Sequence, residues 1–155
     1  MQQLYFEDIE LHEQKVSPEY LVTKEEIIEY ARKWDPQPFH IDEEKAKSSP
    51  FGGLIASASH ITAISFWLLN RAGKGIAVIS GLGWDRMRLP NPVRPGDRLS
   101  LTMECIEKRP SKTSLDRGIL LHSVVVSNQE GVPVSTFETA TLVVRTPLPV
   151  EPQSR

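Results

Sequence analysis

The first third of the chain repeats apolar residues with the period of an α-helix. Positions i, i+3, i+4 and i+7 form one apolar stripe, made by Ile27, Tyr30, Ala31 and Trp34. This spacing predicts a helix over 24–34, with Thr23 as its N-cap and Glu26 completing a capping box. Pro36 excludes the residue before it from the helical region, so we expect Asp35 just past the helix end.

A longer apolar segment follows after a short acidic stretch. The acidic residues at 42–44 predict the first turn of a short helix that reaches about Ser48. Segment 54–69 is apolar around most of a helical circumference, which is typical of a buried helix, and Gly73 is expected to end it. Trp67 is expected in the core.

The second half of the chain changes to the period of a β-strand. Apolar and polar residues alternate over 99–105, as in a half-buried strand. Further strands are predicted over 77–84, 118–126 and 134–144, with a hairpin turn at 128–131. Trp84 is expected in the core, and the prolines between 90 and 95 are expected to interrupt the sheet.

These elements predict an α+β fold. A helix that is apolar nearly all round needs cover on every side, and a curved antiparallel sheet wrapped around a long central helix provides it. A sheet of this size leaves edges and parts of the helix uncovered, so we expect a homodimer or a higher homo-oligomer.

Composition narrows the class of protein. The 155 residues fit one domain, expected over 1–146 and followed by a Pro-rich C-terminal tail over 147–155. A net charge of −2 without a long basic run argues against nucleic acid and acidic membranes as partners. Cys105 is the single cysteine, so no intrachain disulfide forms. Together with an acidic N-terminus that lacks an apolar signal segment, this predicts a cytoplasmic protein.

Candidate chemistry lies in the stretch WDPQPFH at 34–40. Pro36 and Pro38 restrict the backbone, so an ordered bend between Asp35 and His40 loses little entropy. The negative end of one helix favours a protonated carboxyl at Asp35, and the positive start of the next favours neutral imidazole at His40. An acid beside a base suits proton transfer. Ordinary turn chemistry is the alternative interpretation of the pair.

Two glycines, Gly52 and Gly53, stand ahead of the predicted buried helix. Helix N-termini carry unpaired N–H groups and a positive partial charge, and glycines let a ligand oxygen approach closely. A carbonyl held there would be polarised as in an oxyanion hole. A purely structural role in the turn is at least as good an interpretation.

Several motifs now combine in one order along the chain. Residues 35–40, DPQPFH, fit the pattern Asp-x-x-Pro-x-His, and LYFEDIEL, SPFGGLIAS and RPGD flank it at 4–11, 49–57 and 94–97. With these motifs the chain resembles the MaoC-like (R)-specific enoyl-CoA hydratase/dehydratase family, whose members have the hotdog fold. The resemblance implies a hydro-lyase that acts on a 2-enoyl or 3-hydroxyacyl thioester of CoA or an acyl carrier, without a metal or other cofactor.

The resemblance also implies roles for individual residues. Asp35 and His40 match the catalytic pair, and Gly52 matches the glycine whose N–H binds the thioester carbonyl, with Gly53 beside it. Ser57 and His60 are expected to line the acyl pocket, although a histidine on an apolar helix is more often a buried structural residue.

Other functions and sites stay open. A thioesterase or a non-catalytic acyl-CoA-binding protein could share the fold; hotdog thioesterases commonly use a carboxylate near the central helix, and 50–69 contains no Asp or Glu. A metal at His40 and Asp42 lacks a further His or Cys at a matching spacing. Further candidates for binding CoA phosphates are Arg86, Arg88 and Arg94, although arginines that flank strands are usually solvated.

Overall fold

An antiparallel sheet curved around one long helix dominates this computed structural model, which describes residues 2–147. The strand order is β1-β4-β5-β6-β3, and β2 pairs with β4 beside β1. The strands are β1 (Gln14–Val16), β2 (Tyr20–Leu21), β3 (Val78–Arg88), β4 (Arg98–Pro110), β5 (Arg117–Ser127) and β6 (Pro133–Val144). Of the tail predicted over 147–155, all but Pro147 lies outside the described residues.

The four long strands confirm the strands predicted from the sequence and extend beyond the predicted ranges. On β4 and β5, every second residue is buried over most of the strand, so one face of the sheet belongs to the core. The predicted hairpin turn is confirmed, because the Asn128 side chain accepts hydrogen bonds from the N–H groups of Glu130 and Val132. The short strands β1 and β2 were not predicted, since two or three residues carry no readable period.

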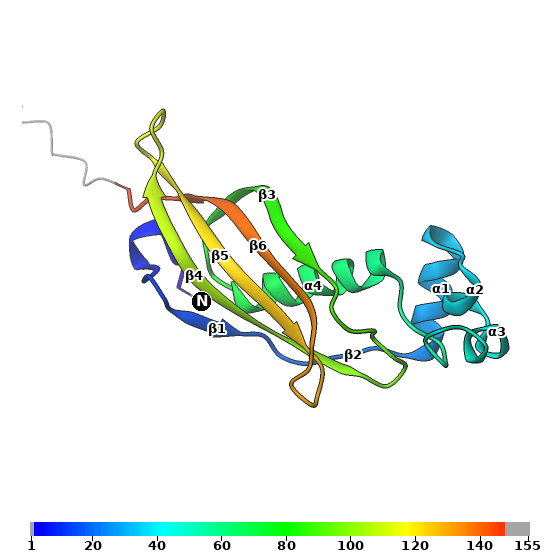
Figure 1. Cartoon of the computed structure of the whole chain (residues 1–155). Coiled ribbons are helices and arrows are strands. Elements are labelled where there is room, and N and C mark those ends of the chain that lie inside the picture. The colour runs from blue at the N-terminus through cyan, green and yellow to red at the C-terminus, as the bar shows by residue number, and fades with distance from the viewer. Residues whose placement is uncertain (1, 148–155) are drawn as a thin grey trace, which may run out of the picture.

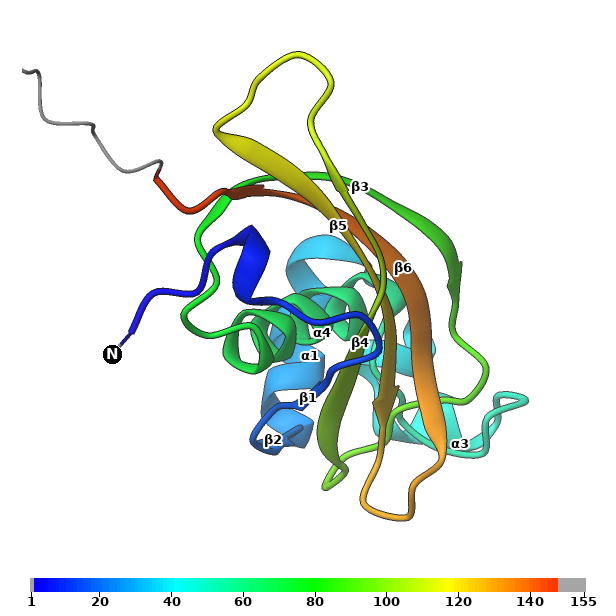
Figure 2. The same cartoon turned by 90° about the vertical axis from the view of Figure 1, so that its left-hand side faces the viewer.

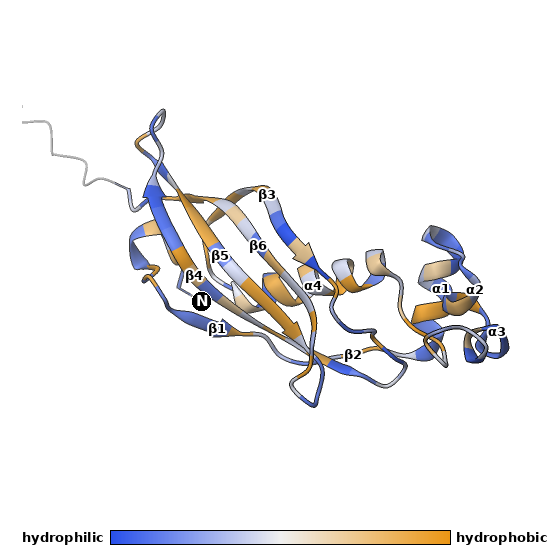
Figure 3. Ribbon diagram, in the orientation of Figure 1, coloured by the Kyte–Doolittle hydropathy of each residue, from blue (hydrophilic) through white to orange (hydrophobic). Residues whose placement is uncertain are grey.

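Helix α4 (Ala58–Ala72) lies in the concave face of the sheet, as Figure 2 shows from the end of the molecule. The ribbons of α4 and of the neighbouring strands contain many apolar residues (Figure 3), and α4 contributes Ile61, Ile64 and Leu68 to the main core. The predicted α+β architecture, a curved antiparallel sheet around a long helix, is therefore confirmed, in the arrangement called a hotdog. Trp67 packs against this core, but the prediction for Trp84 is wrong: it lies on the edge strand β3 and is 56% exposed.

Three shorter helices gather beyond the N-terminal end of α4 (Figure 1): α1 (Lys24–Trp34), α2 (Pro38–Ile41) and α3 (Glu43–Lys47). The bounds of α1 agree with the prediction, and the Thr23 hydroxyl accepts the N–H of Glu26. The predicted capping box is only half formed, because the Glu26 carboxylate accepts the Tyr20 hydroxyl at 2.5 Å and makes no hydrogen bond to the N–H of Thr23. Trp34 ends the apolar stripe 63% exposed, because α1 buries only its first turns.

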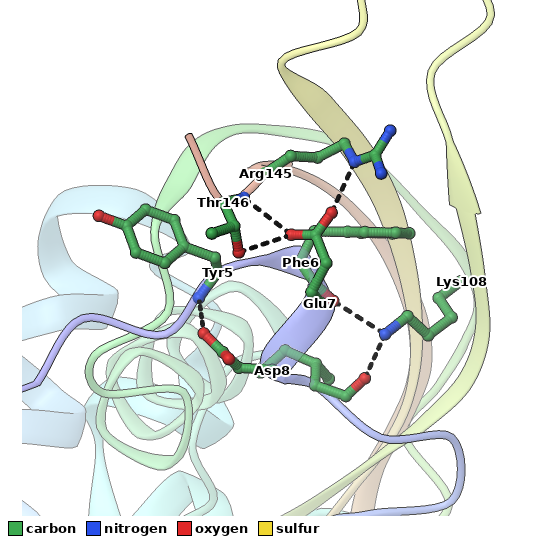
Figure 4. A network of polar contacts seen from close by, with 8 residues as sticks. Tyr5, Phe6, Glu7, Asp8, Lys108, Arg145 and Thr146 are labelled. Atoms are coloured by element: carbon green, nitrogen blue, oxygen red, sulfur yellow. Dashed lines mark hydrogen bonds and ion pairs between the residues drawn. The ribbon is translucent and has the colours of Figure 1, made fainter. Parts of the chain in front are cut away.

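The N-terminal segment closes the far end of the core. A short 3₁₀ turn, η1 (Phe6–Asp8), places the Phe6 ring against Gly118 of β5. Figure 4 shows how polar contacts fasten it: the Glu7 carboxylate accepts hydrogen bonds from Arg145 and Thr146, and the Lys108 ammonium donates to the carbonyl of Phe6. These contacts join residues more than 90 positions apart in the chain.

Candidate active site

Asp35 occupies the C-cap of α1. Its N–H still donates to the carbonyl of Ala31 at 2.9 Å, while its own backbone has left the helical region. Pro36 cannot continue the helix, so the chain turns here as the sequence predicted. The Asp35 side chain is 35% exposed and lies toward α2.

His40 lies in the short helix α2, between Asp35 and α3. The sequence placed it directly before the next helix, but Pro38 starts a four-residue helix of its own. The imidazole is buried, and its Nδ1 lies 2.7 Å from the carbonyl oxygen of Ile55. Because a carbonyl only accepts hydrogen bonds, Nδ1 carries the proton, and in the neutral ring Nε2 keeps the lone pair.

The free nitrogen of His40 faces the carboxyl group of Asp35. Nε2 lies 3.7 Å from Asp35 Oδ2, too long for a direct hydrogen bond and close enough for one small molecule or reacting atom to contact both groups. The structure thus brings together the two residues that the sequence singled out. The bond to Ile55 sets which ring nitrogen of His40 carries the hydrogen in the neutral form.

Both side chains line a cavity of about 330 Å³. Its remaining wall is mostly apolar and comes from segments far apart in the chain: Phe39, Phe51, Ile55, Ala56, Ala58, Ile61, Leu89, Pro90, Asn91 and Pro92. A cavity of this size with two titratable groups in an apolar wall has the usual features of a small-molecule site.

Gly52 and Gly53 lie in a turn before α4 and are not among the residues that line this cavity. The N–H of Gly52 donates to the carbonyl of Ser49 at 3.0 Å, and a positive φ of 67° suits glycine at this turn. The expectation that Gly52 stands at the start of the central helix is wrong, because α4 begins only at Ala58. The structural interpretation of the two glycines accounts for these contacts.

The start of α4 itself borders the cavity. Ser57, which was expected to line the pocket, is not among the residues that line this cavity. It is the N-cap, and its buried hydroxyl accepts the N–H of His60 at 3.3 Å. The N–H groups of Ala58 and Ser59 make no hydrogen bond to any residue in the range 2–147, as is usual in the first turn of a helix. Sequence reasoning missed Ala58; the N-cap preference of Ser57 was the signal that could have located the helix start.

His60 lies between α4 and α1 and not in the cavity. Its Nε2 is 3.3 Å from Glu26 Oε1, and its ring stacks on Tyr30 with centroids 4.4 Å apart. Burial lowers the pKa of His60, and the Glu26 carboxylate only partly offsets this. These contacts fit the interpretation of His60 as a buried structural residue that ties the two helices together.

The three arginines differ in their surroundings. Arg86 forms an ion pair with Glu138 at 2.8 Å, and Arg88 donates to the carbonyl of its neighbour Met87. Arg94 donates to the carbonyl of Phe51, a residue of the cavity wall, at 2.7 Å.

Within residues 2–147, two other kinds of site are absent. No group of three or more His, Cys, Asp or Glu side chains is arranged to hold a metal ion. None of the helices combines the length and the apolar character that a membrane crossing requires.

Known proteins match this chain over most of its length. The family described as MaoC like domain matches residues 8–125. The uncharacterized protein YdeM of Bacillus subtilis (strain 168) is 38% identical over 125 residues, which cover 80% of this chain and 87% of YdeM.

Solved structures of MaoC-like proteins also match this chain over most of its length. The MaoC-like dehydratase from Rhodospirillum rubrum is 38% identical and superposes with a TM-score of 0.87, covering 94% of this chain and 99% of that one. The (R)-hydratase PhaJ1 from Pseudomonas aeruginosa is 21% identical, with a TM-score of 0.69 and coverage of 99% and 97%; this likeness concerns the fold alone.

Proposed function

Since the chain belongs to the MaoC-like domain family and has the hotdog fold, we propose that it is a hydro-lyase acting on an acyl thioester. It adds water to a 2-enoyl thioester, or removes water from a 3-hydroxyacyl thioester, as a MaoC-like enoyl-CoA hydratase or 3-hydroxyacyl thioester dehydratase. The observation that carries this proposal is the placement of His40 Nε2 opposite Asp35 Oδ2 in one cavity.

The pair supplies the proton transfers. In the hydration direction, His40 Nε2 accepts a proton from water as the water oxygen bonds to the β-carbon. Asp35, in its acid form, gives a proton to the α-carbon, and the proton on His40 then returns to Asp35 across the 3.7 Å gap. One water enters and no proton is gained or lost, so the catalyst is restored. The hydrogen bond to Ile55 keeps the accepting nitrogen of His40 toward the reaction.

The start of α4 is the proposed site for the thioester carbonyl. During the addition, negative charge develops on that oxygen, and N–H donors with a positive helix end stabilise it. Ala58 supports this role because it lines the same cavity as Asp35 and His40. On this proposal Gly52 and Gly53 form the turn that leads to the site. Ser57 stabilises the first turn of α4 by accepting the N–H of His60.

We propose that residues 1–146 form a single domain. Two copies of the chain are proposed to assemble as a homodimer. Strand β3 pairs with β6 on one side only, and nearly all of its residues are exposed. The exposed residues include the apolar Val78, Ile79 and Leu82. A long edge strand with apolar side chains favours pairing with a second copy. The cytoplasmic location remains a prediction from the sequence.

Incubation with crotonyl-CoA tests the activity directly. Hydration removes the conjugated double bond, so the absorbance of the enoyl thioester falls, and a thiol reagent detects any free CoA. Loss of absorbance without release of CoA supports the hydro-lyase. Release of CoA would instead support a thioesterase, and binding without either change would support a non-catalytic acyl-CoA-binding protein.

A further inference from the structure

A second cavity, of about 420 Å³, lies at the other end of α4, between the helix and the inner face of the sheet. Apolar side chains such as Phe66, Leu69 and Leu120 form much of its wall. Strand β3 borders it with Trp84, whose ring lies 4.3 Å from that of Phe66. Nothing in the proton transfers at Asp35 and His40 uses this space.

Five polar residues interrupt the apolar wall, Asn70, Lys74, His122, Thr139 and Thr141, and two of them, His122 and Thr139, are buried. His122 of β5 and Thr139 of β6 lie directly opposite each other in the sheet, and both line the cavity. They are only 4% and 3% exposed, and neither side chain makes a hydrogen bond to a residue in the range 2–147. Their polar atoms reach the cavity, since the fully buried polar atoms without a partner in that range are His60 Nδ1 and Ser135 Oγ. Buried polar groups normally have partners, because an unmet hydrogen bond costs stability.

The His122 ring is neutral at physiological pH. Burial lowers its pKa to about 4, and the nearby Lys15 lowers it further while Glu13 raises it. A neutral imidazole offers one donor and one acceptor, and the Thr139 hydroxyl offers both. The two side chains therefore suit an uncharged group that donates and accepts hydrogen bonds. A carboxylate there would meet no positive charge from the ring, and the ammonium group of Lys74 in the cavity wall belongs to an exposed residue.

A row of residues on α4 runs from the first cavity to the second. Ala58, Thr62, Phe66 and Asn70 follow one another at i, i+4 spacing and share one face of the helix. Ala58 lines the first cavity, and Phe66 and Asn70 line the second. Between them the Thr62 hydroxyl lies 3.8 Å from the sulfur of Met87 on β3. Ala58 and Phe66 are about 12 Å apart along the helix axis.

We propose, on the basis of the proposed function, that the acyl chain of the substrate extends along this face of α4 into the second cavity. There His122 and Thr139 select an acyl chain that carries a hydroxyl or carbonyl group near its far end. A plain hydrocarbon chain would cover both polar side chains without bonding them and would bind less well.

The test compares two substrates of equal length, octenoyl-CoA and its ω-hydroxy analogue, by kcat/KM. The wild-type protein is expected to prefer the hydroxylated chain about tenfold, the range of one or two added hydrogen bonds. Thr139→Val removes one hydroxyl with little change of shape and should abolish most of the preference, through KM rather than kcat. His122→Phe should do the same.

Thr136→Val is the matched control, because Thr136 lies on β6 but does not line the second cavity. It should keep the preference of the wild type. If His122→Phe does not fold, Thr139→Val still decides the question. Equal turnover of the two substrates by the wild type, or an unchanged preference in Thr139→Val, would overturn the inference and leave the proposed function intact. Failure to hydrate any enoyl thioester, crotonyl-CoA included, would overturn both.

Discussion

The Nδ1 atom of His40 donates a hydrogen bond to the carbonyl oxygen of Ile55 at 2.7 Å. This bond joins α2 to the segment that leads into α4 and decides which nitrogen of the ring keeps its lone pair. The other nitrogen lies opposite Asp35. The backbone carbonyl of Ile55 thus orients the ring of His40, and a side-chain substitution cannot remove this carbonyl. Substitutions at Asp35 and His40 themselves therefore give the most direct test.

Asp35→Asn and His40→Gln should each lower kcat for hydration of crotonyl-CoA by about 10²–10⁴-fold, because each removes one partner in the proton transfer. The double variant should be little worse than either single variant, since the two groups act as one unit. Asp42→Asn is a suitable control: Asp42 caps α3, asparagine caps equally well, and the residue does not line the cavity. Near-normal turnover in either test variant would remove that residue from the mechanism.

Strand β3 should form the dimer interface. Leu82 is 51% exposed on this edge strand, so Leu82→Lys places a charge where a second copy would pack and should produce a monomer. Light scattering after size-exclusion chromatography measures the mass. Val125→Lys is the matched control, because Val125 is an exposed apolar residue on the central strand β5. A dimer that survives Leu82→Lys would place the interface elsewhere.

The buried ring of His122 should make stability depend on pH. Burial lowers its pKa in the folded protein to about 4, from 6.5, so the unfolded chain binds the proton more readily. The stability from this neutral ring is complete above pH 6.5 and is lost as the pH falls toward 4. In His122→Leu, denaturant unfolding should show a shallower loss over this range; some loss remains, because burial also lowers the pKa of His60. If His122→Leu loses stability with falling pH as steeply as the wild type, the lowered pKa of His122 is contradicted.

The carboxylate of Glu7 should make the stability of the folded protein depend on pH in a more acidic range. Partial burial raises the pKa of this carboxyl, but hydrogen bonds from the Thr146 N–H, from Arg145 and from the Thr146 hydroxyl outweigh it and lower the pKa to about 2, from 4.5 (Figure 4). The contribution of the Glu7 carboxylate to the free energy of unfolding is therefore complete above pH 4.5 and is lost as the pH falls toward 2. Thermal unfolding of Glu7→Gln should show less loss in this range than the wild type, whereas Glu10→Gln should behave as the wild type does.

Gly118 should not tolerate a side chain. A Cβ atom there would lie only 2.8 Å from Cγ of Phe6 and closer still to other ring atoms. Gly118→Ala should therefore destabilise the protein by about 1–3 kcal/mol, the usual cost of overpacking. Chemical denaturation measures the change. Adding Phe6→Leu should recover part of the loss; if Gly118→Ala is neutral, the packing of η1 on β5 is looser than described.

Much of the fold and part of the site were predictable because their signals are local. The cap at Thr23, the stripe of α1, the stop at Pro36 and the alternation along β4 each depend on neighbours within a few residues. The same holds for the bend that carries Asp35 and His40. The start of α4 at Ala58 was also a local signal, carried by Ser57, that the more prominent glycines obscured.

By itself the sequence determined the order of the two longest helices and the four long strands, the curved sheet around a central helix and the choice of Asp35 and His40 as a pair. Only the tertiary structure decided that Ile55 fixes the ring of His40, that Ala58 rather than Gly52 borders the cavity, and that His122 lies opposite Thr139. The physical reason is that these relationships join residues distant in the chain. Strand register and helix packing set them, and no periodicity within a single segment encodes either.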